Sequence, residues 1–235
     1  MTAGHESTNQ RVNNSTARQR FNRSTLACLA LAPLLLLAGC TAVGALAYKV
    51  AGEPDVPAEF AMAKRPTVVI VENFRFPDLA AKDAEFLAQR VQQRLMEKDV
   101  VPIVRTEKVI ELRGKNPAAF RKMTVKEIAQ GVEAEQVLYI SFEAGGFSGL
   151  GGGSTVQGKA AVKVKVIDAA TGDTLWPDVV SDGRSVSFQT SPADGTDRTS
   201  AEALRYKLYD GLAARVVRLF HKFKPSEQGE TMSNG

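Results

Sequence analysis

Cysteine and histidine are scarce in this chain of 235 residues, which has two of each. Cys28 and Cys40 both lie in an apolar N-terminal stretch, so the chain after residue 40 has no disulfide, thiolate nucleophile or thiolate metal ligand. Of the two histidines, His5 and His221, only His221 follows that stretch. One histidine leaves few ways to build a zinc site or a histidine-based proton-transfer pair. We therefore expect no metal site and no cofactor.

A broad excess of positive charge is also lacking once the N-terminus is set aside. The whole chain has a formal net charge of +4. Up to residue 40 it has one acidic residue, Glu6, and four arginines: Arg11, Arg18, Arg20 and Arg23. The remaining chain is nearly neutral, which argues against nucleic acid as a partner. With 44% hydrophobic and 24% charged residues, the composition is that of a globular protein.

The N-terminal apolar stretch is typical of an exported protein. Basic residues precede an apolar run from Leu26 to Leu37, and small residues follow it, as in a secretory signal peptide. The run ends in Leu37-Ala38-Gly39-Cys40, which resembles the lipobox of bacterial lipoproteins. This resemblance implies cleavage after Gly39 and attachment of lipid, including palmitate, to Cys40. Residues 1–39 are then a signal peptide, and membrane lipid holds the mature protein through Cys40.

An uncleaved membrane anchor is the alternative interpretation of this stretch. No charged residue interrupts the chain from Leu26 to Tyr48, and such a segment is long enough to span a bilayer. Both interpretations leave the arginines inside and place the rest of the chain on the extracytoplasmic side. Thr41 stands where aspartate would follow the cysteine, which favours the outer membrane, facing the periplasm, over the inner membrane.

The rest of the chain divides into a tether, one domain and a tail. Residues 40–65 are rich in glycine and proline and show little periodicity, which predicts a lipidated N-terminus followed by a flexible tether. Residues 66–225 carry the patterns of strands and helices and are predicted to form the globular domain. Residues 226–235 are polar, and we expect a disordered tail.

The domain pattern predicts an α/β (α+β) fold. We expect a mixed sheet with helices packed on it, an antiparallel meander in the second half and a C-terminal helix. Thr124 and Glu127 form a capping box that opens the helix 125–131. The other expected helices are 79–98 and 200–222, and the expected strands are 67–71, 100–104, 136–142, 159–168, 174–176 and 184–190.

The glycine-rich stretch from Gly145 to Gly153 is a candidate phosphate-binding loop by composition alone. It lacks the Gly-Lys-Ser/Thr ending of such loops and precedes a strand rather than a helix, so we interpret it as a flexible hairpin connection. Phe147 and Leu150, set among its glycines, are candidate contacts for a partner. Trp176 is expected to pack in the core or at a sheet edge, with a partner contact as the second interpretation.

The order of elements behind a lipobox resembles a group of bacterial envelope domains. The resemblance rests on the strand 67–71 running into residues 72–74, the helix 80–98, the strands 137–140 and 161–168, and the turns and strand of 171–176. The order of elements in this chain is similar to that of the curli-secretion lipoproteins (CsgG-like), the amino-terminal domain of TolB and the LpoB-type activators of peptidoglycan synthases. The pore of the secretion channels comes from long inserted hairpins, and we see no comparable pair of strands here.

These patterns favour a binding or assembly role over catalysis. The chain has neither a Gly-x-Ser-x-Gly elbow nor an HExxH motif. We expect a non-enzymatic envelope lipoprotein that binds another envelope protein or itself. The alternatives are a hydrolase acting on carbohydrate through paired carboxylates, and an oligomer subunit like that of a secretion channel. A pocket of acids with perturbed pKa values would favour the enzyme, and an exposed apolar patch would favour binding.

Overall fold

The computed structural model describes residues 53–72, 81–149, 154–179, 182–194 and 198–226, which all belong to one compact unit beginning at Glu53. The lipobox, Cys40 and Leu150 lie outside the described residues. In the described part of the chain, no helix is long and apolar enough to cross a membrane. The apolar segment 26–48 is not among those residues.

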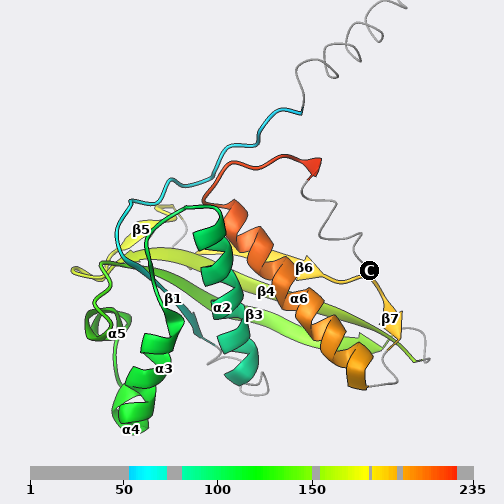
Figure 1. Ribbon diagram of the computed structural model, residues 1–235, viewed down its shortest axis with the longest axis horizontal. Helices are drawn as coiled ribbons and strands as arrows, with labels where there is room; N and C mark the ends of the chain where they lie inside the picture. The colour runs from blue at the N-terminus through cyan, green and yellow to red at the C-terminus, as the bar shows by residue number, and fades with distance from the viewer. Residues whose placement is uncertain (1–52, 73–80, 150–153, 180–181, 195–197, 227–235) are drawn as a thin grey trace, which may run out of the picture. The chain divides into compact units, whose positions relative to one another are not determined.

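A seven-stranded mixed sheet with helices on it confirms the predicted α+β fold (Figure 1). The strands are β1 (Thr67–Glu72), β2 (Ile103–Val104), β3 (Gln136–Gly149), β4 (Thr155–Asp168), β5 (Thr174–Trp176), β6 (Arg184–Gln189) and β7 (Ala193–Asp194). The helices are α2 (Ala81–Glu97), α3 (Thr106–Lys115), α4 (Pro117–Phe120), α5 (Val125–Gly131) and α6 (Arg198–Arg218).

The sheet changes from parallel to antiparallel at β3. Strand β1 lies between β2 and β3 and is parallel to both, whereas β3 and β4 are antiparallel. The antiparallel second half is confirmed, but the predicted meander is wrong in one respect. Strands β5, β6 and β7 all pair with β4, one after another along the same edge. Three short strands share this edge because β4 is long enough to pair with each in turn.

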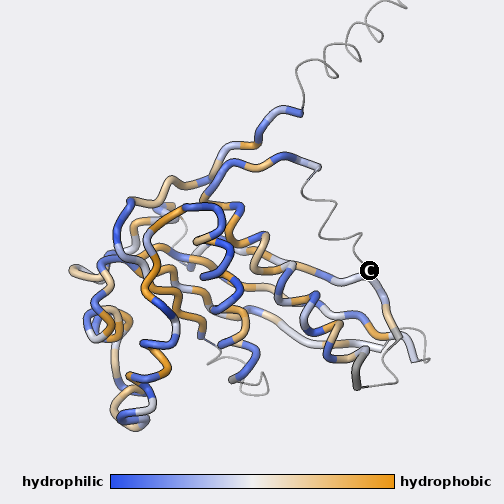
Figure 2. The backbone as a smooth tube through the Cα atoms, viewed as in Figure 1, coloured by the Kyte–Doolittle hydropathy of each residue, from blue (hydrophilic) through white to orange (hydrophobic). Residues whose placement is uncertain are grey.

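Helices cover the two faces of the sheet unequally. The alternation of side chains along each strand sends Leu138, Ile140 and Val164 towards α2 and α6, where the larger apolar core lies. Figure 2 shows apolar positions along the central strands and at intervals along α2 and α6. Val68 and Val137 point to the opposite face, where they pack with residues of α5 in a smaller core. The smaller core reaches only the part of β3 that begins the strand.

The helix α6 packs beside α2 through an apolar stripe and a cluster of charges. Leu204, Leu208, Leu212 and Val216 are buried along its length, as predicted for the C-terminal helix. Asp210 accepts hydrogen bonds from Nε of Arg90 at 2.7 Å and from a guanidinium nitrogen of Arg94 at 2.7 Å. These contacts fix the relative position of the two helices above the sheet.

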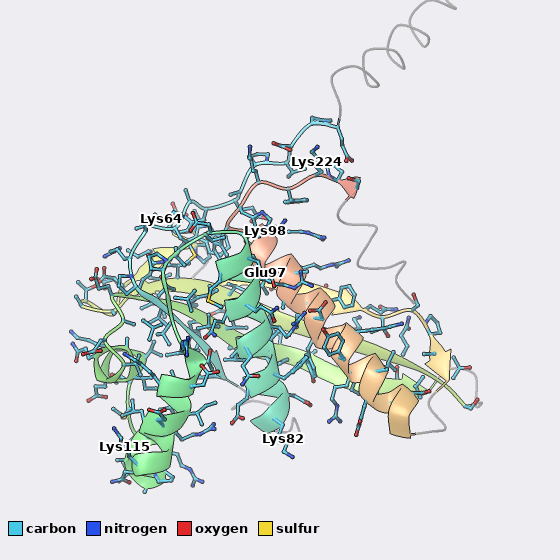
Figure 3. All side chains as sticks on the ribbon, in the orientation of Figure 1. Lys64, Lys82, Glu97, Lys98, Lys115 and Lys224 are labelled. Atoms are coloured by element: carbon cyan, nitrogen blue, oxygen red, sulfur yellow. The ribbon has the colours of Figure 1, made fainter. Side chains whose placement is uncertain are left out.

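Local sequence signals account for some helix boundaries and not for others. The capping box is confirmed, because Oγ1 of Thr124 accepts from the Glu127 amide at 3.2 Å and the Glu127 carboxylate accepts from the Thr124 amide at 2.6 Å. Helix α3 was not predicted, because only Thr106 of its residues is buried and no apolar stripe identifies it. Figure 3 shows Lys115 at its end directed away from the sheet.

The predicted tether is wrong for residues 53–65, which pack on the domain. Val56 and Phe223 exchange backbone hydrogen bonds of 2.7 and 3.1 Å, and the Phe60 amide donates to the Leu219 carbonyl at 3.0 Å. These two segments run side by side in Figure 1, and Lys224 lies on the second of them in Figure 3. The backbone pairing could not be read from the sequence, because it joins residues far apart in the chain. The packed domain therefore begins at Glu53.

Candidate functional site

The smaller-core face contains a polar pocket of about 170 Å³ in a part that no helix of the described residues covers. Strands β1, β3 and β4 and the residues before β6 supply its walls. Its lining residues are Glu72, Tyr139, Ser141, Phe142, Glu143, Lys163, Lys165 and Asp182. Alternation explains most of this set, because Tyr139, Ser141 and Glu143 on β3 and the two lysines on β4 are spaced two residues apart and point to one face. The pocket begins where the cover of α5 ends.

The strand register aligns several of these groups in rows across the sheet. Glu72 is the register partner of Ser141, which in turn lies opposite Lys163. In the neighbouring row, Tyr139 lies opposite Lys165. Adjacent strands are about 4.8 Å apart, so a ligand the size of one ring reaches groups from three strands at once.

The carboxyl group of Glu72 is partly removed from water at the end of β1. The Tyr139 hydroxyl donates a hydrogen bond to Oε2 of Glu72. Burial raises the pKa of Glu72 above its ordinary value, and the hydrogen bond from Tyr139 opposes that change without cancelling it. Glu72 is therefore a carboxyl group that takes up a proton more readily than an exposed glutamate.

Lys163 bridges two acids on the opposite wall. Its Nζ lies 3.5 Å from Oε1 of Glu143 and 3.3 Å from Oδ2 of Asp182. The hydroxyl of Ser185 in β6 also donates to Glu143 at 2.9 Å. The charge of Lys163 is thus already balanced within the wall.

Two polar groups of the pocket remain without partners. Within the described part of the chain, neither the ammonium group of Lys165 nor the hydroxyl of Ser141 has a hydrogen-bond or ion-pair partner. Lys165 alternates with buried valines along the strand, a pattern typical of a strand with one solvated face. Nothing in the sequence connected Lys165 with Glu72.

Residues 145–149 do not form the loop that the sequence predicted. They extend β3, where Gly145 to Gly149 pair with Val156 to Ala160 of β4. A β-bulge at Phe142 and Ala144 precedes this extension. Glycine was taken as the mark of a loop, yet ladder hydrogen bonds use only backbone atoms and tolerate it. The hairpin is therefore longer than predicted, and only residues 150–153 fall outside the described chain between its strands.

The extended part of β3 has an open edge. Strand β1 pairs with β3 only as far as Ser141, and no other described strand lies along residues 143–149 on that side. The Thr190 amide donates to the Gly158 carbonyl at 2.9 Å, so the backbone of Gly158 points away from β3. Its cross-strand neighbour Phe147 therefore points its own N–H and C=O outwards, as do Gly145 and Gly149.

The three predicted contact residues have different positions. Phe147 is 40% exposed, and its ring covers Gly158, where an added Cβ would lie 2.8 Å from Cε1 of the phenylalanine. Trp176 is only 8% exposed and stacks on Phe60 with ring centroids 5.9 Å apart. The ring of Trp176 is thus used for packing, as in the first interpretation, and a partner contact by Trp176 stays a prediction. Leu150 lies outside the described residues.

Other features limit the chemistry that the described residues support. They contain no group of three or more histidine, cysteine, aspartate or glutamate residues that could hold a metal ion. The outward face of the extended hairpin carries Gln157 and Lys159, which are not residues that face lipid. The hairpin thus has the length, but not the alternating apolar pattern, of the channel hairpins considered above.

Among the comparisons with known proteins, only the comparison with solved structures finds proteins similar to this chain. No family model matches the chain, and no curated protein is similar to it. Lipoprotein GNA1162 from Neisseria meningitidis is 16% identical with a TM-score of 0.40, over 65% of this chain and 95% of that one. The PelC dodecamer from Paraburkholderia phytofirmans is 16% identical with a TM-score of 0.35, over 72% and 95%. The hypothetical protein CT253 from Chlamydia trachomatis is 13% identical with a TM-score of 0.38, over 65% and 95%.

Solved structures similar to this chain thus include a bacterial lipoprotein. The specific resemblance to CsgG-like, TolB and LpoB-type domains stays a prediction.

Proposed function

We propose that this chain is a lipid-anchored envelope protein with a non-enzymatic role in binding or assembling other proteins. The lipobox at Leu37-Ala38-Gly39-Cys40 supports lipidation and export. The chain between Cys40 and the packed residue Glu53 spans at most roughly 45 Å when fully extended. The domain would therefore work close to the membrane, on the extracytoplasmic side, with the periplasmic face of the outer membrane as the favoured location.

The open edge of β3 is the observation that carries the binding role. From Ala144 to Gly149 the edge has no charged residue and no proline. Exposed edge strands are usually protected by such residues, because their free backbone groups pair readily with other chains. The bulge that precedes Ala144 is the only such device that this part of β3 has among the described residues. The unprotected edge supports regular occupation by another strand.

Pairing of a partner strand with this edge explains the residue types found there. In β-strand addition, main-chain hydrogen bonds give affinity and side chains near the edge give specificity. The glycines leave the backbone accessible, and Phe147 supplies a partly exposed ring beside it. The partner is another envelope protein or a second copy of this chain.

A proline at the edge tests this proposal. Gly149→Pro removes an outward N–H without removing a ladder bond to β4, whereas Gly149→Ala keeps the N–H, and an added Cβ there meets no atom within 4 Å. We expect the full-length proline variant to lose copurifying partner or self-association, measured by sedimentation and pull-down from membranes. The alanine variant should keep both. Equal association of the two variants would contradict pairing at the edge.

A carbohydrate hydrolase is the second candidate, favoured by one observation. Glu72 combines a raised pKa with a position in a pocket that also holds Glu143 and Asp182. Hydrolysis of envelope polysaccharide that Glu72→Gln abolishes would support this candidate. Unchanged activity of that variant would exclude Glu72 as the acid.

A further inference from the structure

The polar pocket lies where the strand order of the sheet changes direction. From β1 the chain crosses by α2 to β2 on one side, and then returns by α3, α4 and α5 to β3 on the other side. Helix α2 belongs to the larger core and α5 to the smaller, so the two crossovers cover opposite faces. In open α/β sheets, ligands bind beyond the carboxyl ends of strands at such a switch point. Glu72 is the last residue of β1, at this position.

The free groups of the pocket define what a ligand must offer. Lys165 presents an unpaired ammonium group, and Ser141 presents an unpaired hydroxyl, on neighbouring strands. Both can donate hydrogen bonds to a carboxylate, and the ammonium group also supplies the opposite charge. Glu72 accepts hydrogen bonds and suits a ligand hydroxyl. The pocket thus offers hydrogen-bond donors to an anionic group and a hydrogen-bond acceptor to a hydroxyl group of the same ligand.

The volume of the pocket and the charges around it limit the classes of ligand that it can bind. A pocket of about 170 Å³ is smaller than the sites of drug-sized ligands, so it suits roughly one six-membered ring. Glu143 and Asp182 surround Lys163 and would repel a ligand of high negative charge. A single carboxylate on a hydroxylated ring meets both limits, whereas a phosphate with two charges does not.

We propose that this pocket binds a single sugar-acid ring, with the carboxylate on Lys165 and Ser141 and a ring hydroxyl on Glu72. The proposed contacts are with Glu72, Ser141 and Lys165, whereas the unprotected edge runs from Ala144 to Gly149, so the proposal does not depend on whether that edge binds a partner. It does not require hydrolysis, because the contacts described are those of recognition.

D-Glucuronate is the probe that tests this proposal, with the full-length chain in detergent. Binding is followed by saturation-transfer NMR and by titration, with D-glucose, acetate and inorganic phosphate as competitors. We expect Lys165→Gln to weaken glucuronate binding about 10- to 100-fold, the usual effect of losing a charge-assisted hydrogen bond. Lys159→Gln is the matched control, since Lys159 is an exposed lysine on the same strand and face, beyond the pocket. That variant should bind like the original chain.

Each outcome decides the proposal. Glucuronate binding that weakens with Lys165→Gln and Ser141→Ala, but not with Lys159→Gln, supports it. Absence of binding at millimolar glucuronate, or equal affinity of the two lysine variants, overturns it. If phosphate or acetate binds the pocket more tightly than glucuronate does, the proposed class of ligand is wrong. If glucose binds as tightly as glucuronate, the carboxylate has no role in recognition. The Gly149→Pro variant should bind glucuronate like the original chain, whether or not it loses its protein partner.

Discussion

The two faces of the sheet differ in how completely helices cover them. On the face under α2 and α6, Leu138, Ile140 and Val164 are all fully buried. On the other face, Val137 is fully buried, but Ser141 and Lys163, further from α5, are partly exposed. The covered face stabilises the fold through burial of apolar area. The uncovered half holds polar groups that the fold does not need, which makes it the part available for binding.

A cavity in the covered face should give the largest loss of stability. Leu212 in α6 is fully buried, and we expect Leu212→Ala to lower the free energy of unfolding by about 2–5 kcal/mol. Met96 is 49% exposed, so Met96→Ala is the control and should change it far less. Urea denaturation measures both variants. Equal effects would contradict the difference between covered and exposed positions.

Substitution of two helical glycines by alanine tests how closely α6 packs on β6. A Cβ on Gly211 would lie 2.3 Å from a ring carbon of Phe188, so Gly211→Ala should cost about 1–3 kcal/mol by overpacking. Gly114 in α3 has no atom within 4 Å of an added Cβ, and Gly114→Ala should stabilise by about 0.5–1 kcal/mol. Thermal unfolding gives both changes. A stabilised Gly211→Ala variant would show that α6 does not lie this close to Phe188.

The charged cluster between α2 and α6 should contribute a smaller amount. Asp210 is 19% exposed and bonds both Arg90 and Arg94, so Asp210→Ala should lower the free energy of unfolding by about 1–3 kcal/mol. The side chain of Lys64 is 59% exposed in its ion pair with Asp99. Lys64→Ala should therefore change the free energy of unfolding by less than about 1 kcal/mol. Denaturation at low and high salt measures both. A larger loss in Lys64→Ala would contradict this ranking.

The open face predicts a pH-dependent effect of Glu72, the smallest of the series. Because burial raises its folded pKa, the folded state holds the proton more tightly than the unfolded state. Above the raised pKa, the charged carboxylate of Glu72 lowers the free energy of unfolding. As pH falls through that pKa, Glu72 takes up a proton and the free energy of unfolding increases. Glu72→Gln should stabilise the domain more at pH 7 than at pH 4. Denaturation at the two pH values tests this, and the opposite trend would contradict it.

Local signals in the sequence predicted those features that depend on neighbouring residues. The capping box at Thr124 and the strand 159–168, in which Val162, Val164 and Val166 alternate with lysines, were both confirmed. The extension of β3 through Gly149 could not be predicted, because glycine carries no side-chain pattern and its partners lie in β4. The packing of residues 53–65 was missed for the same reason, since Phe60 depends on Trp176 and on the Leu219 carbonyl.

The candidate site shows the same limit. Phe147 was predicted as a contact from its place among glycines, and it is partly exposed beside the open edge. The pocket was not predicted, because Glu72 and Lys165 line the same pocket only through the order of β1, β3 and β4 in the sheet. Their charges alone gave no reason to join them.

Site-specific photo-crosslinking at the β3 edge tests the central claim most directly. A benzophenone amino acid replaces Phe147 in intact bacteria, and Tyr206, which is 49% exposed on α6, serves as the control position. We expect a discrete crosslinked product, with an envelope protein or a second copy, from position 147 alone. Gly149→Pro should abolish this product and Gly149→Ala should keep it. No product at position 147, or one that Gly149→Pro leaves unchanged, would contradict a binding role for this edge.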